Sequence, residues 1–312
     1  MERSLIEIRP LSITEIISAS LRSLYRNPGG TLLISLNFAV ILGLISLFGF
    51  YLAPIEDSFL DDLAALDSPA AADPLLLQNL LNQALPTITF LASLTFLLYL
   101  FQGVVTGIIA PVIGFLVTGS KLTRNEAWLR VKNQIGKLFA LSFVILILEI
   151  SAFFAPLFIA AIISSVFPPV VNGFLISLSL VVAIVLVIFV WTSLLLAPVV
   201  LILENTTIKL SLLRSRKLVK KNFARILFGT IWASIIGQAL ALFGQLPFSI
   251  ISQSSQSGNQ ITTFSTFTET VGTIIGYSLL LSFIASYLCL LYTDQRIRHE
   301  DLANNLKLAR GQ

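Results

Sequence analysis

The sequence predicts an all-α membrane protein, a polytopic bundle of six transmembrane helices, and three observations lead to this class. Of its 312 residues, 56% are hydrophobic and only 12% are charged. The mean hydropathy is +0.91. Soluble domains carry about a quarter charged residues, so this composition cannot cover a water-soluble protein. The hydrophobic residues also gather in long runs, which is typical of an integral membrane protein.

Six apolar runs are long enough to cross a bilayer, which takes about 20 residues. The second, third and fourth runs exceed one perpendicular crossing, so we expect them to tilt or kink. Pro111, Pro156 and Pro198 fall inside these three, where proline removes a helix hydrogen bond, and Pro168 and Pro169 mark a turn between the third and fourth. The runs cover residues 31–53, 86–117, 138–167, 172–203, 226–251 and 271–293.

The basic residues predict the orientation of the chain. All 20 Lys and Arg residues lie before the first run, between the second and third, between the fourth and fifth, or after the sixth. In a six-span chain these segments share one side, and cytoplasmic loops carry the excess of Lys and Arg. We therefore expect both termini in the cytoplasm, with the chain in an inner (cytoplasmic) or another internal membrane. Charges continue to Arg26, so no cleaved signal peptide is expected.

The opposite side is acidic. Residues 54–85 form a non-cytoplasmic segment with six acids and no Lys or Arg. Its carboxylates alternate with leucines, which favours a short amphipathic helix on the membrane over a cation site. Residues 294–312 form a cytoplasmic tail, and we expect residues 1–312 to form a single membrane domain.

Three short amphipathic helices are predicted to precede spans one, three and five. Ser12 with Glu15, and Thr123 with Glu126, have the spacing of capping boxes, and the third helix begins near Thr207. Each helix ends in a basic residue followed by asparagine. The recurrence predicts a threefold repeat of an amphipathic helix and a transmembrane hairpin; internal repeats also occur in transporters.

One carboxylate is predicted to lie deep inside a span. Glu149 is costly there, so it is the first functional candidate. With no Lys, Arg or His in any span, its expected partners are uncharged amides. Two interpretations stay open: a structural polar clamp, and a group that handles a proton or a substrate. The candidate polar site consists of Glu149, Asn37, Gln102, Gln238 and Gln245.

A dense basic segment lies between the fourth and fifth runs. Such a cluster attracts anionic lipid headgroups, at about 1 kcal/mol per cation near the surface, but it also serves as a topology signal. No aromatic side chains are interleaved with it, so nucleic acid is not an expected partner. Nearby Glu204 is expected to form an interfacial salt bridge. The candidate lipid contacts are Lys209, Arg214, Arg216, Lys217, Lys220, Lys221 and Arg225.

The residue counts argue against enzymatic chemistry. The single cysteine, Cys289, and the single histidine, His299, exclude an internal disulfide and zinc or haem sites that need several such ligands. The sequence has no Walker loop, Ser-His-Asp set or HExxH pattern. We expect no catalytic residues, no metal and no cofactor. The GxxxG spacings 103–107 and 272–276 are predicted to serve internal helix packing.

Four segments together resemble a bacterial membrane family. They are residues 9–27, 197–204, 215–223 and 290–300. In this order they are similar to the glycerophosphoryl diester phosphodiesterase membrane domain family, which is related to poorly characterised six-span proteins. The resemblance implies a membrane architecture. It does not imply the phosphodiesterase activity, because residues 294–312 leave no room for a catalytic barrel of about 250 residues.

The expected function is therefore that of a non-enzymatic accessory, scaffold or lipid-interacting component of a bacterial membrane. Its expected partners are membrane lipids with anionic headgroups on the cytoplasmic side, and other membrane protein subunits. The alternative is a transporter or lipid translocator that uses Glu149 in a buried polar site. An intramembrane enzyme would need a nucleophile with its base, or a metal set, and the sequence assembles neither.

Overall fold

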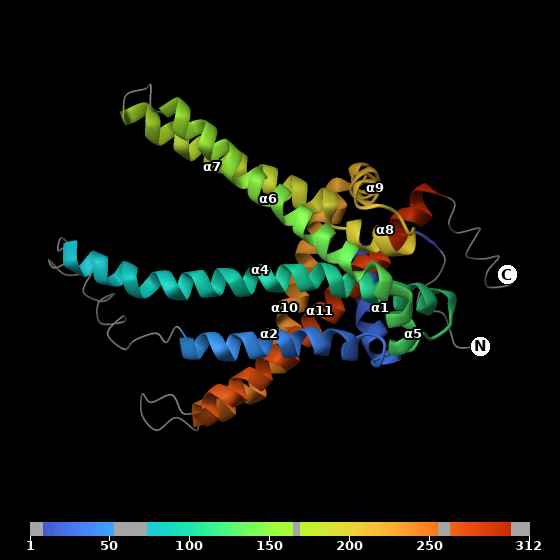
Figure 1. Cartoon of the computed structure of the whole chain (residues 1–312). Helices are drawn as coiled ribbons and strands as arrows, with labels where there is room; N and C mark the ends of the chain where they lie inside the picture. Colours follow the sequence, from blue (N-terminus) through green and yellow to red (C-terminus); the bar gives the residue numbers. More distant parts are fainter. Residues whose placement is uncertain (1–8, 53–73, 165–168, 255–262, 301–312) are drawn as a thin grey trace. The chain divides into compact units, whose positions relative to one another are not determined.

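The chain folds into helices throughout the part that the structure describes (Figure 1). The structure is a computed structural model that describes residues 9–52, 74–164, 169–254 and 263–300, and it contains no strand in these ranges. This confirms the all-α prediction. The helices are α1 (Ile13–Arg26), α2 (Leu32–Leu52), α4 (Pro74–Thr118), α5 (Arg124–Val131), α6 (Ile135–Ser164), α7 (Pro169–Leu194), α8 (Ala197–Leu203), α9 (Ile208–Lys220), α10 (Phe223–Ser254) and α11 (Thr263–His299), with a 3-10 turn, η2, at Lys132–Gln134.

Among the described residues, five helical stretches are long and apolar enough to cross a membrane, and they match the second to sixth predicted runs. The first predicted run corresponds to α2, of which Leu32–Phe48 is a shorter apolar helix. The composition and lengths of these helices are those of a membrane protein. The five stretches are Leu80–Thr118, Arg124–Ser164, Val171–Leu203, Phe223–Ser254 and Phe264–His299.

The helix α4 begins earlier than predicted. It starts at Pro74 and not at residue 86, so it takes up the end of the segment expected to be acidic and peripheral. Residues 74–85 carry no charge and are rich in leucine, a strong helix former, and proline suits the first helical position. All six acidic residues that were predicted to lie in an amphipathic helix fall in 53–73, outside the described residues.

Proline breaks only one of the three long runs. The predicted run 172–203 is divided into α7 and α8, and Pro198 lies in the first turn of α8, where its missing N–H costs no helical hydrogen bond. In contrast, α6 continues through Pro156 and α4 through Pro111. Pro169 begins α7, whereas Pro168 is outside the described residues.

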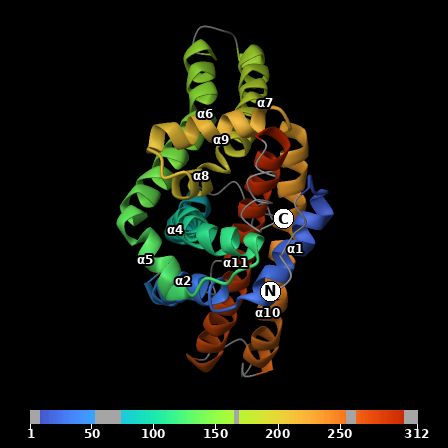
Figure 2. The ribbon, with the colours of Figure 1, turned by 90° about the vertical axis from the view of Figure 1, so that its right-hand side faces the viewer.

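The chain divides into two compact units, and α2, α4, α10 and α11 contribute residues to both. Unit 1 contains Met1–Ser35, Gln102–Leu240 and Leu279–Gln312, and unit 2 contains Leu36–Phe101 and Ala241–Ser278. In unit 1, α4 and α11 occupy the centre, with α1, α5 and α9 around them (Figure 2). The fully buried large side chains of this core include Ile108, Ile109, Ile113, Phe283 and Tyr287.

Both GxxxG spacings serve packing within a unit, as predicted. In unit 1, Gly103 and Gly107 of α4 face Ser142 and Leu138 of α6, and a Cβ on Gly107 would lie 2.5 Å from Leu138 Cδ2. In unit 2, a Cβ on Gly276 of α11 would lie 2.7 Å from the carbonyl oxygen of Ala241 in α10. Only glycine allows these helix pairs to approach so closely.

Unit 2 has its own side-chain contacts. The Phe38 and Phe101 rings pack edge to face with their centroids 5.3 Å apart. The Ser252 hydroxyl donates a hydrogen bond of 2.8 Å to the Glu269 carboxylate. The unit therefore joins residues of α2 with α4, and of α10 with α11.

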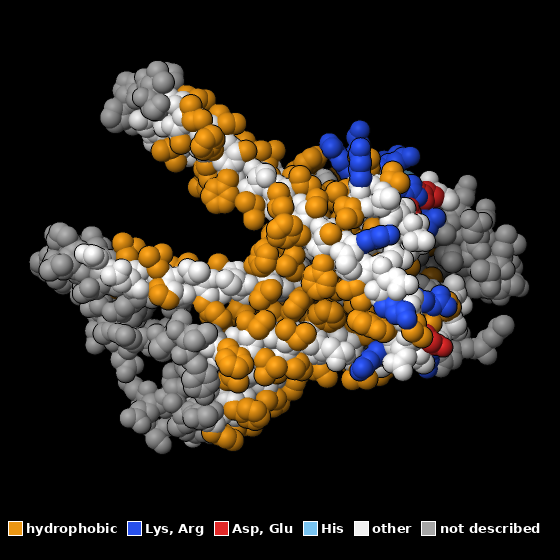
Figure 3. All heavy atoms as spheres, in the orientation of Figure 1, with side chains coloured by type: hydrophobic (Ala, Val, Ile, Leu, Met, Phe, Trp, Pro, Cys, Tyr) orange, Lys and Arg blue, Asp and Glu red, His pale blue; other side chains and the backbone are white. Residues whose placement is uncertain are grey.

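The α6–α7 hairpin of unit 1 is apolar on all sides. In the most apolar window, only 22% of the residues of the α6 stretch and 11% of those of the α7 stretch are buried. Phe154, Phe158, Phe174 and Val181 are exposed, and hydrophobic side chains cover the hairpin in Figure 3. A helix that is hydrophobic all round is typical of a buried or membrane-spanning segment, so the exposed apolar surface of the hairpin is compatible with a membrane protein.

Candidate functional site

Most ion pairs of the described residues in unit 1 involve the last turns of α11, where side chains from the start of α10, the end of α8 and α9 meet it. They form two groups. We call Leu11, Arg225, Asp294 and Arg298 the Asp294 cluster, and Glu204, Arg214, Tyr292, Arg296 and Glu300 the Glu204 cluster.

Leu11 of the Asp294 cluster directly precedes Ser12, the N-cap of α1. The Ser12 hydroxyl accepts a hydrogen bond of 3.2 Å from the Glu15 backbone N–H, and the Glu15 carboxylate accepts one of 2.7 Å from the Ser12 N–H. Arg9 pairs with Glu15 at 2.6 Å. The backbone bond from Ser12 and then the bond from Arg9 lower the pKa of Glu15 to about 2. This capping box confirms the predicted start of the first amphipathic helix.

The other two amphipathic helices also begin as predicted. Thr123 and Glu126 form a second capping box at α5, and Thr207 is the N-cap of α9, where its hydroxyl accepts from the Leu210 N–H at 3.5 Å. The hydrogen bond from the Thr123 backbone lowers the pKa of Glu126.

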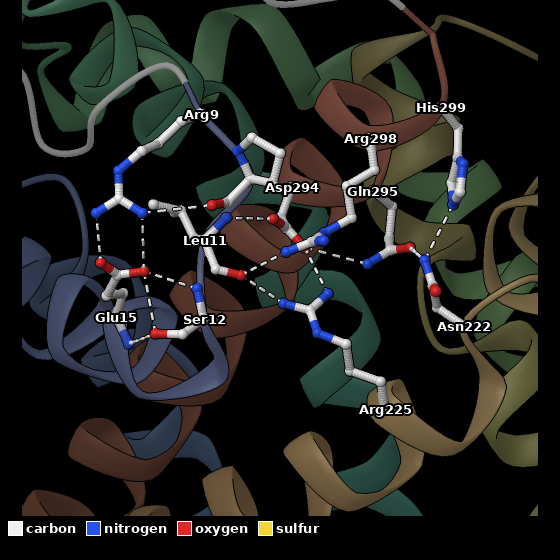
Figure 4. A network of polar contacts seen from close by, with 11 residues as sticks. Arg9, Leu11, Ser12, Glu15, Asn222, Arg225, Asp294, Gln295, Arg298 and His299 are labelled. Carbon is white, nitrogen blue, oxygen red and sulfur yellow. Dashed lines mark hydrogen bonds and ion pairs between the residues drawn. The ribbon is translucent and has the colours of Figure 1, made fainter.

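Asp294 is a fully buried carboxylate with charged partners (Figure 4). Its Oδ1 accepts a hydrogen bond of 2.8 Å from the Leu11 backbone N–H. Its Oδ2 pairs with Arg225 Nη1 at 2.8 Å and with Arg298 Nε at 2.9 Å. The two arginine side chains retain 26% and 27% exposure, whereas the aspartate has none. The carboxylate therefore holds two guanidinium groups that are themselves partly in contact with solvent.

The same two arginines also bind the chain before α1. The Leu11 carbonyl accepts a hydrogen bond of 2.7 Å from Arg298 and another from Arg225. Each guanidinium thus bridges the Asp294 carboxylate and the Leu11 carbonyl. The cluster ties together the chain before α1, the first turn of α10 and the last turns of α11, and it carries one more positive than negative charge.

Asn222, two residues after α9 ends, extends the hydrogen-bond network of the Asp294 cluster. The Asn222 amide donates to Gln295 Oε1 at 2.9 Å and contacts His299 Nε2 at 3.0 Å, while the Gln295 amide donates to Asp294 Oδ2 at 3.2 Å. Asn27, at the corresponding junction after α1, instead donates to the Leu122 carbonyl at 2.7 Å. The recurring basic-asparagine pairs therefore have different tertiary partners.

The Glu204 cluster contains two carboxylates and two guanidinium groups, so its charges cancel. Arg214 pairs with Glu204 at 3.2 Å and also with Glu300, and Arg296 pairs with Glu300 at 3.0 Å. Burial alone would raise the pKa of Glu300, but the hydrogen bonds from Arg214 and Arg296 outweigh it and lower that pKa. Burial opposes the charged form of Arg214 as well, yet its two carboxylate partners raise its pKa. The salt bridge predicted for Glu204 is confirmed.

Tyr292 is buried, although it lies at the basic end of a predicted span. Tyrosines near the basic ends of spans commonly anchor a helix at the interface, but only 2% of Tyr292 is exposed. Its hydroxyl donates to Glu204 at 2.8 Å and accepts from Arg296 at 3.1 Å. The buried phenol has these polar partners within the unit, so it need not reach water.

The exposed side of α9 is basic and partly apolar. Leu210 and Leu213 are 54% and 55% exposed, while the opposite face of the helix, with Ser211, Ser215, Leu218 and Val219, is buried. Of the seven predicted lipid contacts, Arg214 and Arg225 belong to the two ion clusters. The other five are exposed: Lys209, Arg216, Lys217, Lys220 and Lys221.

The predicted intramembrane polar residues are divided between the units. Half-buried Glu149 lies in α6, and Gln102 and Gln238 also belong to unit 1, whereas Asn37 and Gln245 belong to unit 2. Gln102 donates to Thr106 of its own helix at 3.2 Å. The candidate polar site thus has three members in unit 1.

No cluster suited to a metal occurs among the described residues, where no three His, Cys, Asp or Glu side chains come together. Cys289 is buried in α11, with its Sγ 3.9 Å from the Thr106 carbonyl oxygen.

Neither Asp294 nor Leu11 was among the site residues predicted from the sequence. The signal available was the i to i+4 spacing of Asp294 with Arg298 and of Arg296 with Glu300, which places opposite charges on one helix face. That spacing indicates local ion pairs, but the partners Leu11, Arg214 and Arg225 come from distant segments.

Comparison with known families corrects the expected family. The glycerophosphoryl diester phosphodiesterase membrane domain assignment is wrong, because the family model that matches the chain is a different one. The four segments behind that resemblance supply most of the residues of the two ion clusters and the α1 capping box. Only short polar motifs are needed to cap a helix or to pair charges at its end. Membrane proteins of different families can share such motifs.

The matching model is described as "Domain of unknown function (DUF7847)", and it covers residues 11–295. No curated protein matches the chain, and no solved structure does. The matched region begins at Leu11 and ends at Gln295, beside Asp294, so it spans the segments that the Asp294 cluster joins. The chain belongs to the DUF7847 family.

Proposed function

We propose that this protein is a non-enzymatic integral membrane protein whose helix α9 binds anionic lipid headgroups, and that it serves as an accessory or scaffold component of a bacterial membrane. The observation that carries the proposal is the surface of α9 and its C-cap Lys221, which together have five exposed cations and two exposed leucines. Figure 3 shows Lys and Arg side chains gathered at this end of unit 1.

The physical basis is the combination of charge and apolar area. Each cation close to an anionic membrane contributes about 1 kcal/mol, and leucines on the same surface can enter the headgroup region. Arg214 and Arg225 contribute less, because carboxylates already neutralise them. The apolar α6–α7 hairpin supports a scaffold role, since its exposed side chains offer a surface to other membrane protein subunits.

The proposal includes a topology with six crossings. The α2 helix has 21 residues, which at 1.5 Å per residue is about the thickness of the hydrocarbon core. Six crossings put α1, α5, α9 and the end of α11 in the cytoplasm, in a threefold plan of interfacial helix and hairpin. A reporter fused after Asp67 should behave as non-cytoplasmic, and a cytoplasmic signal from it would contradict this topology.

The lipid role is tested with purified protein and vesicles of phosphatidylglycerol or phosphatidylcholine. The triple variant Lys217→Gln, Lys220→Gln, Lys221→Gln should bind phosphatidylglycerol at least tenfold more weakly, since it loses about 3 kcal/mol before salt screening. The control Arg124→Gln, Lys132→Gln, Lys137→Gln removes three exposed cations outside α9. Equal losses in the two variants would show that only net charge matters, and would refute a role for α9.

A second candidate function is transport that uses Glu149. Its support is the position of a half-buried carboxylate within the long apolar helix α6. An ionisable group is energetically costly inside a membrane span, which makes it a candidate for a functional role. In proteoliposomes, Glu149→Gln should abolish a proton flux that the unaltered protein shows, at equal reconstitution. A flux that persists in the variant would exclude Glu149 as a proton carrier.

A further inference from the structure

A pocket in unit 1 shares no lining residue with the exposed face of α9 or with either ion cluster. It has a volume of about 390 Å³ and is lined by the end of α4, by Arg130 of α5 and by Ile202 and Leu203 of α8. Ligand pockets commonly measure about 300–1,000 Å³. The α4 wall consists of Pro111, Gly114, Phe115 and Thr118.

The walls are apolar, and one cation stands among them. The Arg130 guanidinium carbon lies 4.5 Å from the centroid of the Phe115 ring, an arrangement that holds the cation against an aromatic face. None of the lining residues is acidic. Within the described part of the chain, Arg130 forms no salt bridge. After the hydrogen bonds from Thr123, the charge of Arg130 also lowers the pKa of Glu126, but this attraction leaves the N–H groups of Arg130 able to bond an incoming acceptor. Glu126, one turn earlier on α5, is engaged by the backbone and hydroxyl of Thr123.

Glycine keeps the pocket open on the α4 side. A Cβ on Gly114 would meet only Leu203 Cδ2, at 4.0 Å, so there is room for a methyl group on this wall of the pocket. By contrast, Gly107, two turns earlier on the same helix, has no such room. Position 114 therefore allows the pocket to be filled by substitution without a collision in the core.

The ligand must match one cation and apolar walls together. A soluble anion would bind the guanidinium group but leave the apolar walls in contact with water. A neutral hydrocarbon would cover the walls but give the guanidinium group no acceptor. A phospholipid satisfies both parts: its phosphate accepts hydrogen bonds from Arg130, and the start of an acyl chain contacts Gly114 and Leu203. An additional negative charge on the headgroup favours it further, because the neighbouring segments are basic.

We propose that this pocket binds one anionic phospholipid, with its phosphate at Arg130 and its acyl chain against Gly114 and Leu203. The inference rests on the proposed membrane location of the chain, but not on lipid attraction by α9. It assigns a defined site with a stoichiometry of one, in contrast to the diffuse attraction expected of exposed lysines.

The test is native mass spectrometry of the purified full chain with added phosphatidylglycerol. Arg130→Gln should weaken the first bound lipid at least tenfold, whereas Arg124→Gln, which removes an exposed cation from the same helix, should change it less than twofold. Gly114→Leu should abolish the adduct by filling the pocket, and Gly114→Ala should retain it. Thermal unfolding of each variant in detergent checks that the fold is intact.

The outcomes separate this proposal from its alternatives. Equal effects of Arg130→Gln and Arg124→Gln, or an adduct that survives Gly114→Leu in a folded protein, would overturn it. Displacement of the lipid by inorganic phosphate at equal concentration would show that the site recognises phosphate alone, and would also overturn it. The α9 triple variant should keep the one-to-one adduct while losing vesicle binding, so either proposal can fail without the other.

Discussion

Replacing Asp294 by asparagine removes the single negative charge that two arginines share in unit 1. The amide oxygen of the new side chain could still accept the Leu11 N–H, which now donates to Oδ1 at 2.8 Å. The amide nitrogen would then take the place of Oδ2, which now accepts from Arg225, Arg298 and Gln295. A donor would face three donors, so the substitution replaces attraction by repulsion at a site with no exposed area.

The expected loss follows from these contacts. Breaking a buried ion pair by removing one partner costs about 3–5 kcal/mol. The two guanidinium groups retain 26% and 27% exposure, and water can solvate them in part, so we expect about 3 kcal/mol, at the lower end. Arg225→Gln should cost less, about 1–2 kcal/mol, because Arg298 still pairs with the carboxylate.

The assay is urea unfolding in detergent micelles, followed by circular dichroism, with hydrogen exchange on the peptide covering α1. Asp294→Asn should lower the unfolding free energy and speed exchange in α1, because Leu11 loses its anchor. Glu126→Gln, an acid-to-amide change in the exposed capping box of α5, is the control and should have a much smaller effect. A loss below about 1 kcal/mol for Asp294→Asn, with α1 exchange unchanged, would refute the proposed anchoring.

Two further predictions concern helix packing and pH. Gly276→Ala should lower the unfolding free energy by about 1–3 kcal/mol, because the new Cβ would lie 2.7 Å from the Ala241 carbonyl oxygen. The control Gly173→Ala should be neutral, because nothing lies within 4 Å of its Cβ. Equal melting temperatures of the two variants would contradict the packing argument. Since its arginine partners lower the pKa of Glu300 below its ordinary value of 4.5, the carboxylate stabilises the fold above that pH and loses this contribution as the pH falls through the lowered pKa. Glu300→Gln should therefore flatten the acid side of the stability profile, and an unchanged profile in the variant would show that Glu300 does not contribute.

The helices themselves were largely predictable, because the signals for them are local. A chain in a bilayer must satisfy its backbone hydrogen bonds within each segment, so long apolar runs become helices such as α6 and α10. Capping boxes are equally local, and Ser12 and Thr123 begin helices as predicted. The early start of α4 at Pro74 was missed because residues 74–85 are neither charged nor uniformly apolar, so hydropathy alone did not include them.

The candidate site was less predictable. The seven cations from Lys209 to Arg225 form one basic block in the sequence, yet Arg214 and Arg225 pair with carboxylates and the five others face outward. Helical periodicity places residues on faces, but it does not say which face meets an acid from another helix. The arginine that lines the pocket, Arg130, had no signal that distinguished it from Arg124 in the same helix.

The sequence by itself determined the all-α class, the positions of the apolar helices and the N-caps of the amphipathic helices. These depend on composition and on contacts between residues a few positions apart. Only the tertiary structure decided that Leu11 and Asp294, which are 283 positions apart, lie in hydrogen-bond contact, and that α4, α5 and α8 enclose a pocket. Such pairings depend on how the close-packed helices of unit 1 meet, at Gly103 and Gly107 for example, and no period in the sequence encodes which distant side chains that packing brings together.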